Sequence, residues 1–370
     1  MSSTDIFSLF LVTVTIFASC GESHDAAALE EQGVNHELVL LDSIGIEFGD
    51  SNYVFGMPRA VEFTSRGNVV VGDISSMKLM MYSPDGTFIC SGGSEGQGPG
   101  EYTAPSGISS TPSGGIAVSD AMSGKIIFYD SSLDYSHELT GFTPQPPGVP
   151  EILDDGSIVG TRFGFDRESG KLTNTLSLWK PEETEASFDY LERSSSFDQQ
   201  NPMKVYQEIG INFCVLEDGR VIVSPLSADE YSLTCYNTEN GMDWEIHPTY
   251  EKKRRSEEDL EIEREMMRNA MRRNGQDASY ADQLELQEWA NAVTGLYAQK
   301  DKIWVRRGNN LLPLFDVYST DGEFLYSCSV PNMPFGSNIA FTISPYSSVI
   351  LAFLANPEDY PKIWLLQEVD

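Results

Sequence analysis

A repeat of 47 residues constrains the fold of this 370-residue chain more than any other feature. Val61–Phe88 reads VEFTSRGNVVVGDISSMKLMMYSPDGTF, and Ile108–Tyr135 reads ISSTPSGGIAVSDAMSGKIIFYDSSLDY. Five pairs align without a gap: Val61/Ile108, Gly67/Gly114, Val71/Val118, Asp73/Asp120 and Tyr82/Tyr129. Each copy alternates short apolar runs with turns that contain Gly or Asp, which predicts a four-stranded antiparallel meander.

The rest of the chain carries four weaker copies of this pattern. They are marked by Ile152–Val159, by Phe213–Val223, by Lys302–Val305 with Phe315–Phe324, and by Asn338–Ser344 with Ser348–Leu354 and Lys362–Gln367. The sixth copy has only three strands, whereas Glu37–Ile46 is an apolar strand with no local partner. An unpaired sheet edge is a liability, and closure of a ring removes it. We therefore predict an all-β fold over residues 37–370, a six-bladed β-propeller closed by its N-terminal strand.

The stretch GGSEGQGPGEY at residues 92–102 invites two catalytic interpretations. Its first five residues match the G-x-S-x-G pattern of a hydrolase nucleophile elbow, and its glycines resemble a phosphate-binding loop. Both sites need a helix after the loop, which Pro99 and its flanking glycines cannot open, and two acids stand where a phosphate loop needs a cation. The repeat instead predicts a crossover between blades one and two, since Pro58 and Pro105 are also 47 residues apart. Its expected structural residues are Gly98, Gly100, Glu101 and Tyr102.

The N-terminus predicts export and lipid anchoring. Ile6–Ala18 is an apolar run with the length of a signal-peptide core, too short to span a bilayer as a helix. Phe17–Gly21, FASCG, is similar to the lipobox of bacterial lipoproteins, in which the cysteine receives the lipid. We therefore expect a signal peptide at residues 1–19, a lipidated tether at residues 20–36 that begins with Cys20, and a location in the cell envelope. An ordinary cleaved signal peptide with an incidental cysteine is the alternative.

The net charge limits which classes of partner are possible, and the cysteine spacing indicates the state of the thiols. The chain has 56 acids and 24 bases, a net charge of −32. Such a surface repels phosphate backbones and excludes nucleic acid as a partner. The partners that remain are the membrane lipid of the anchor and a protein or glycan ligand. The other four cysteines are widely spaced, and we expect buried free thiols on strands: Cys90, Cys214, Cys235 and Cys328.

The segment at about residues 251–293 interrupts the β pattern between the fourth and fifth copies. It is rich in Glu, Arg, Met and Ala, and Ser256–Asp259 resembles a capping box at a helix start. A second helix is expected from about Tyr280 to Ala292. The basic cluster Lys252–Arg255 is expected to pair with neighbouring acids or to touch anionic lipid. We predict an inserted helical hairpin that acts as a lid, a Met-rich docking surface or a decoration of the rim.

The crossover also carries a family resemblance. Gly96–Tyr102, GQGPGEY, is followed by Pro105 and by an inner strand that ends at Asp120. This pattern resembles NHL-repeat-like six-bladed propellers, and within them the envelope lipoproteins of Bacteroidetes-type bacteria that have a G-x-G-P-G-E-[FY] signature. The resemblance covers roughly residues 37–370 and is sharp over about residues 53–130. It implies the fold and the location more firmly than an activity.

Propellers with lactonase or lyase activity are similar in fold and hold a divalent metal in the axial channel. By that resemblance, inner strands would supply the ligands, and oxygen ligands suit Ca²⁺. The candidates are Glu62 and Glu151, which stand five residues before a turn glycine, and Asn212 and Asn338, near the starts of inner strands. The same register holds Ser109 and Cys214 in blades two and four, so this ring of ligands is incomplete. Solvated polar residues at the channel mouth are the alternative interpretation.

Two functions therefore stay open. The first is a non-enzymatic, lipid-anchored propeller that binds a ligand or a protein partner on its loops or its insertion. The second is a metal-dependent enzyme of the lactonase or lyase type that acts at the channel. Surface glycan binding is a third hypothesis and would need exposed aromatic side chains. No catalytic residue is assigned, and Ca²⁺ is the one cofactor considered.

Overall fold

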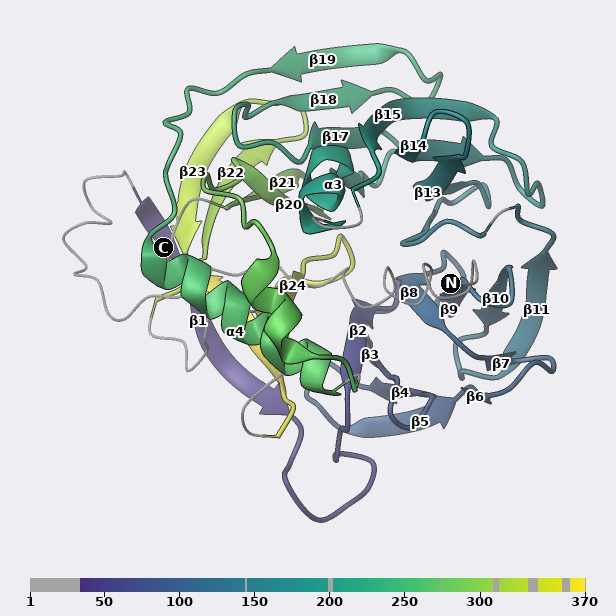
Figure 1. Ribbon diagram of the computed structural model, residues 1–370. Helices are drawn as coiled ribbons and strands as arrows, with labels where there is room; N and C mark the ends of the chain where they lie inside the picture. The colour runs from purple at the N-terminus through teal and green to yellow at the C-terminus, as the bar shows by residue number, and fades with distance from the viewer. Residues whose placement is uncertain are drawn as a thin grey trace.

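The computed structural model describes residues 34–143, 145–198, 202–273, 275–308, 313–331, 339–354 and 360–369. Their strands form six four-stranded antiparallel blades arranged around a central axis (Figure 1). This arrangement confirms the predicted all-β, six-bladed propeller. Within the described ranges, no helix is long and apolar enough to cross a membrane.

Each of the first five blades is one continuous stretch of chain, with its innermost strand first. Blade one contains β2 (Pro58–Phe63), β3 (Val69–Asp73), β4 (Lys78–Tyr82) and β5 (Phe88–Gly92). Blade two contains β8 (Pro105–Ser110), β9 (Ile116–Asp120), β10 (Lys125–Tyr129) and β11 (Tyr135–Thr140). Blade three contains β12 (Glu151–Ile152), β13 (Ile158–Asp166), β14 (Lys171–Trp179) and β15 (Phe188–Ser196). Blade four contains β16 (Ile211–Val215), β17 (Val221–Pro225), β18 (Leu233–Tyr236) and β19 (Met242–Ile246). Blade five contains β20 (Val293–Gln299), β21 (Lys302–Arg307), β22 (Leu314–Ser319) and β23 (Phe324–Ser329).

Blade six combines the two ends of the chain. It contains β24 (Ile339–Thr342), β25 (Val349–Leu354), β26 (Ile363–Val369) and, as its outer strand, β1 (Val34–Ile44). β1 pairs antiparallel with β26 over seven residue pairs, which confirms the predicted closure. Its first residues also pair in parallel with β23 of blade five, a contact that the sequence did not predict. The N-terminal strand therefore joins two blades.

The core lies between the blades. Strands β3 and β9 are buried at every position, because neighbouring blades cover both faces of each sheet. Between blades one and two, for example, Val70 and Met81 pack in one cluster with Ile116 and Tyr129. Comparable clusters join blades four and five and blades six and one. The described cysteines are free thiols, and three of the four are buried.

A buried aspartate holds each of the first two crossovers. Asp73 accepts hydrogen bonds from the backbone N–H groups of Gly56 (2.6 Å) and Met57 (3.1 Å), just before β2. Asp120 accepts them from Thr103 (2.8 Å) and Ala104 (3.1 Å), just before β8. Donors and acceptors all keep the offset of 47 residues, so the repeat conserves this contact as well as the strands.

The stretch at residues 92–102 follows the outer strand of blade one and leads to blade two. Two short strands, β6 (Ser94–Glu95) and β7 (Glu101–Tyr102), pair in parallel within it. Glu101 Oε2 accepts from the N–H of Gly98 (2.8 Å), and Gly100 O accepts from the Tyr129 hydroxyl (2.9 Å). The Tyr102 ring is buried. The structure thus places all four predicted crossover residues in the connection between the blades.

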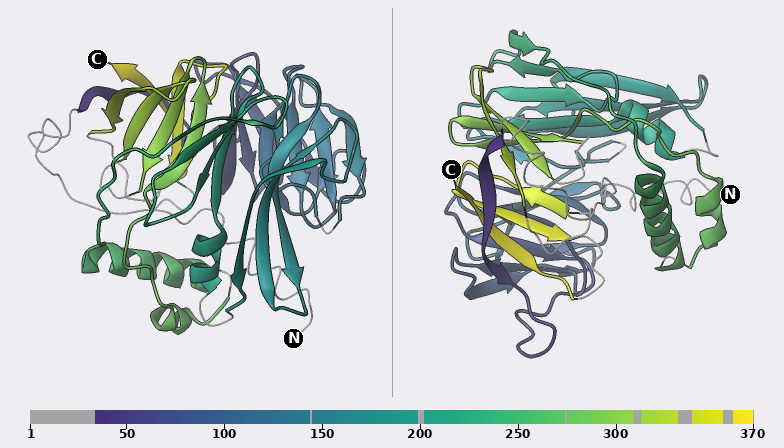
Figure 2. Two further views of the ribbon diagram at one scale, coloured as in Figure 1. Left: turned by 90° about the horizontal axis from the view of Figure 1, so that it is seen from above. Right: turned by 90° about the vertical axis from the view of Figure 1, so that its left-hand side faces the viewer.

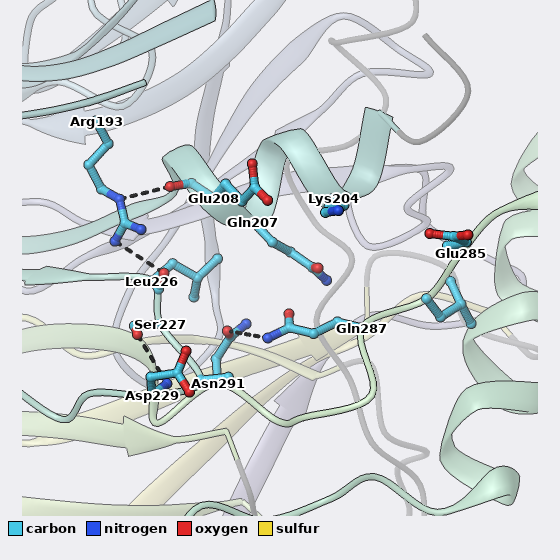
Figure 3. Close-up of a pocket in the computed structure, with 12 residues that line it drawn as sticks. Arg193, Lys204, Gln207, Glu208, Leu226, Ser227, Asp229, Glu285, Gln287 and Asn291 are labelled. Atoms are coloured by element: carbon cyan, nitrogen blue, oxygen red, sulfur yellow. Dashed lines mark hydrogen bonds between the residues drawn. The ribbon is translucent and has the colours of Figure 1, made fainter. Parts of the chain in front are cut away.

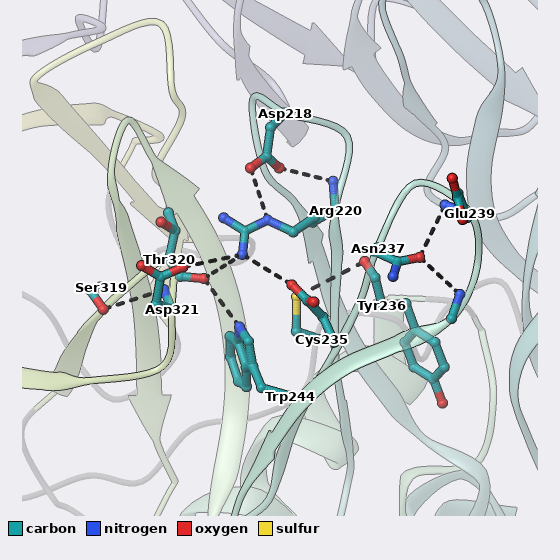
Figure 4. A network of polar contacts seen from close by, with 12 residues as sticks. Asp218, Arg220, Cys235, Tyr236, Asn237, Glu239, Trp244, Ser319, Thr320 and Asp321 are labelled. Carbon is teal, nitrogen blue, oxygen red and sulfur yellow. Dashed lines mark hydrogen bonds and ion pairs between the residues drawn. The ribbon is translucent and has the colours of Figure 1, made fainter.

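Polar side chains link blades four and five at the end of the strands that lies opposite the blade-to-blade crossovers (Figure 4). Arg220 Nε donates to Asp218 (2.8 Å), and its NH1 group donates to the backbone oxygen of Thr320 on blade five (3.0 Å). The Trp244 indole N–H donates to the same oxygen (3.3 Å). These contacts fix the angle between the two blades at their turns.

Three additions project from the face of the ring that carries the blade-to-blade crossovers (Figure 2). They are the long β13–β14 hairpin, helix α3 (Pro202–Ile209) and the predicted insertion, which contains helix α4 (Glu257–Arg273) and the 3₁₀ helix η1 (Ala278–Gln283). The capping box is confirmed, since Asp259 N–H donates to Ser256 Oγ (3.1 Å) and Ser256 N–H donates to Asp259 Oδ2 (2.9 Å).

The prediction of a second helix from about Tyr280 to Ala292 is wrong beyond Gln283, where η1 ends. From Leu284 the chain is extended, because it returns along the arm that leads into α4. Arg255 N–H donates to Glu288 O (2.8 Å), and Ala290 N–H donates to Lys253 O (3.0 Å). These bonds between the two arms replace the hydrogen bonds of a helix.

The basic cluster pairs largely with acids, as the first interpretation expected. Lys252 pairs with Asp229, Arg254 with Glu288 (3.2 Å) and Arg255 with the buried Glu263 (2.5 Å).

Candidate ligand-binding channel

A cavity of about 580 Å³ lies on the propeller axis. All six inner strands, β2, β8, β12, β16, β20 and β24, contribute lining residues. Between them they present apolar side chains, such as Ile108, Phe213 and Leu296, and a few polar or charged residues, Arg59 among them. Its volume falls within the range of roughly 300–1,000 Å³ that is typical of small-ligand sites.

Glu62 and Glu151 both line this cavity, and the charge of Glu151 affects the ionisation of Glu62. Burial, followed by the negative charge of Glu151, raises the pKa of Glu62 to about 8. Burial alone raises the pKa of Glu151 to about 7. Removing water from a carboxylate disfavours its charge, and a neighbouring negative charge adds to that cost. Positive charge placed between these two groups would offset both effects.

An acidic rim, formed by blades three and four, lies at the end of the channel at which the first and second strands of each blade turn. Asp154 and Asp155 come from the turn of blade three, and Glu217 and Asp218 come from the turn of blade four. Tyr346 lies among them: burial raises the pKa of its hydroxyl, and Asp154, Glu151 and Glu217 raise it further. This rim was not predicted from the sequence, although its acids stand in the matching repeat segments LDDG and LEDG.

The other predicted channel residues contribute less. Asn212 Nδ2 donates to Val293 O (3.3 Å) and so links blades four and five, and Asn212 is not among the lining residues. Ser109 is buried, and its hydroxyl donates to the adjacent Ser110 O (3.2 Å). Cys214 is among the lining residues, and burial keeps the pKa of its thiol well above the usual range. Asn338 lies outside the described residues, as does the predicted lipidation site Cys20.

The donor set matches a divalent metal only in part. Glu62 and Glu151 offer carboxylate oxygens, whereas Ca²⁺ takes six to eight oxygen ligands. Among the described residues, no group of three or more His, Cys, Asp or Glu side chains is arranged to hold a metal ion. We therefore assign no catalytic step to a metal at this site.

Comparisons with known proteins agree with the ring architecture. The sequence profile of a domain family described as a 6-bladed beta-propeller matches residues 45–141. A Bacteroides fragilis protein that is inferred to be exported superposes with a TM-score of 0.54 at 13% identity, covering 95% of this chain and 98% of its own. Among curated proteins, no sequence matches the chain significantly.

Two enzymes are among the other solved structures that align with the chain. Gluconolactonase from Xanthomonas campestris is 11% identical with a TM-score of 0.45, over 96% of this chain and 97% of its own. Virginiamycin B lyase from Staphylococcus aureus is 9% identical with a TM-score of 0.46, over 90% of this chain and 99% of its own. At such identities a shared fold does not imply a shared activity.

Proposed function

We propose that this protein is an exported, lipid-anchored binding protein of the cell envelope, and that its axial channel captures a cationic ligand. The N-terminal segment supports the location. The likeness to the Bacteroides fragilis protein that is inferred to be exported supports it as well. The convergence of Glu62 and Glu151 in an axial cavity with an acidic rim supports the ligand charge. The rigid ring holds these carboxylates in place before a ligand arrives.

The raised pKa values predict how binding depends on pH. At neutral pH the pair retains a proton, because Glu62 titrates at about 8 and Glu151 at about 7. A cationic ligand favours the ionised carboxylates and must displace that proton. Affinity should therefore rise as the pH rises from about 6 to about 8.5, with proton release on binding.

Isothermal titration of the full-length protein tests this function, with Ca²⁺ and the triamine spermidine as separate probes. We expect at least one of them to bind, more tightly at pH 8.5 than at pH 6. Glu62→Gln with Glu151→Gln should reduce the affinity at least tenfold and abolish the pH dependence. Glu323→Gln, an exposed carboxylate on an outer turn of blade five, is the matched control.

The two probes also separate the possible ligands. Binding of Ca²⁺ alone would assign the channel to a metal, and binding of spermidine alone would assign it to an organic cation. If neither probe binds, or if the double variant binds as wild type does, the proposed cation site is wrong. Labelling with radioactive palmitate tests the anchor, since Cys20→Ala should lose the label that the wild-type chain incorporates.

A hydrolytic or lyase activity is the second candidate. It is favoured by the same two carboxyl groups, whose pKa values near neutrality would suit proton transfer. Lactone hydrolysis by wild-type protein with added Ca²⁺, lost in Glu151→Gln, would support it.

A further inference from the structure

A second pocket lies among the additions on the crossover face and shares no lining residue with the channel. Figure 3 shows the residues that line it. Its volume is about 340 Å³, within the range of small-ligand sites. Its walls come from four places: outer strand β15, helix α3, the loop between β17 and β18, and the return arm of the insertion. Two of these, α3 and the insertion, are additions to the propeller repeat.

Two cationic side chains face this pocket without a carboxylate partner. Arg193 donates from Nε to Glu208 O (2.9 Å) and from NH1 to Leu226 O (3.1 Å), both of them backbone atoms. Among the described residues Arg193 forms no ion pair, and the carboxylates of Glu208 and Glu230 act on it only at longer range. Lys204 is exposed on α3 and makes no hydrogen bond or ion pair within the same ranges. Unpaired cations in a chain of net charge −32 favour a negatively charged ligand.

Three primary amides supply the neutral part of the lining. Asn291 is only 6% exposed, and its Oδ1 accepts from Gln287 Nε2 (3.2 Å). The amino group of Asn291 has no partner in the described part of the chain, and neither has the side chain of Gln207, which lies between Arg193 and Lys204 in Figure 3. An amide offers both a donor and an acceptor, which is what a hydroxyl group requires. A ligand with several hydroxyl groups fits this lining.

Three carboxylates also line the pocket, and among the described residues none of them forms an ion pair with Arg193 or Lys204. Asp229 pairs with Lys252, and Glu208 accepts from the Ser195 hydroxyl. Glu285 lies at the opposite end of the pocket from Arg193 (Figure 3).

We propose that this pocket binds an acidic saccharide, a sugar with a carboxylate that pairs with Arg193 or Lys204 and hydroxyl groups that bond to the amides of Gln207, Gln287 and Asn291. Charge-assisted hydrogen bonds to the carboxylate provide affinity, and the amides select for the polyhydroxylated ring. This site is independent of the cation site in the channel.

Titration calorimetry with digalacturonate tests the proposal, with its methyl ester as the uncharged counterpart. We expect the wild-type protein to bind digalacturonate and to bind the ester at least tenfold more weakly. Lys204→Glu and Gln207→Ala should each weaken digalacturonate binding at least threefold. Lys180→Glu, an exposed lysine on a turn of the opposite face, should leave binding unchanged.

Four outcomes would overturn the assignment: no binding of digalacturonate at millimolar concentration, equal binding of the ester, wild-type affinity in Lys204→Glu, or equal binding of N-acetylglycine. The last outcome would show that the pocket recognises a carboxylate and does not require the hydroxyl groups of a sugar. The channel variant with Glu62→Gln and Glu151→Gln should bind digalacturonate as the wild type does. That result separates this pocket from the function proposed for the channel.

Discussion

At the scale of single residues, Asp120 shows how one side chain fixes the path between blades. It is fully buried, and it is surrounded by backbone N–H groups and the Ser123 hydroxyl (2.7 Å). Burial opposes its ionisation, but hydrogen bonds from Ser123, Thr103 and Ala104 outweigh burial and lower its pKa. The folded protein therefore stabilises the charged form, and that stabilisation is lost as the pH falls below the ordinary Asp value.

Asp120→Asn should lower the free energy of unfolding by about 2 kcal/mol at pH 7, because an amide turns one acceptor into a donor that faces N–H groups. The loss should shrink below about pH 4, where the aspartate of the unfolded chain takes up a proton, and should shrink further as the pH falls through the lowered pKa of folded Asp120. Urea denaturation measures both values. Asp134→Asn, an exposed residue of the same blade, is the control and should change stability by less than about 0.5 kcal/mol. Equal effects of the two changes would contradict the role of Asp120 in holding the crossover.

Glu62 should have the opposite pH dependence. Its pKa rises from 4.5 to about 8 on folding, so the folded state holds a proton that the unfolded state releases. Stability therefore falls as the pH rises from about 4.5 to about 8. Glu62→Gln removes this loss and should stabilise the protein by about 2 kcal/mol at pH 8 and by almost nothing at pH 4.5. Thermal denaturation across this range measures it, with Glu323→Gln as a control that should show no such trend.

At the scale of elements, the crossover at residues 92–102 needs glycine for two reasons. Gly96 has φ +153°, and a Cβ there would lie 2.0 Å from Glu101 Oε2. Gly170, in the β13–β14 turn, has φ +64° and nothing within 4 Å of its Cβ position. A substitution at Gly170 therefore measures the cost of backbone strain alone, whereas a substitution at Gly96 measures backbone strain together with steric contact.

Gly170→Ala should cost about 1 kcal/mol from the left-handed backbone alone. Gly96→Ala should cost about 3 kcal/mol, since Glu101 must leave its hydrogen bond with Gly98. Equilibrium unfolding in urea compares the two. Similar costs would show that Glu101 moves aside freely and does not pin the crossover.

The extent of prediction from sequence also differs between elements. The strands of blades one and two follow from local signals, since apolar runs and turn residues lie within a few positions of each other. Helix α3 and the extended return arm of the insertion depend on contacts between distant segments, such as Arg255 with Glu288. In the channel, the register predicted that Glu62 and Glu151 share a position. The acidic rim was missed because its residues read as ordinary turn acids.

At the scale of the whole molecule, ring closure depends on the interior side of β1. Leu38 is fully buried in a cluster with Trp304 and Phe315, whereas Leu41 on the same strand is 50% exposed. Leu38→Ala should lower the free energy of unfolding by about 3 kcal/mol. Leu41→Ala should change it by less than about 0.5 kcal/mol. Chemical denaturation that finds equal losses would contradict the closure by β1.

The same closure sets the order in which the protein can fold. Among the described strands, β1 is made before all others, and its antiparallel partner β26 is made after all others. The contact spans nearly the whole chain, and pairings of such high sequence separation form slowly. Until β26 arrives, the growing propeller keeps two open sheet edges, which invite aggregation. Synthesis of β26 is thus the step that converts an open array of blades into a closed ring.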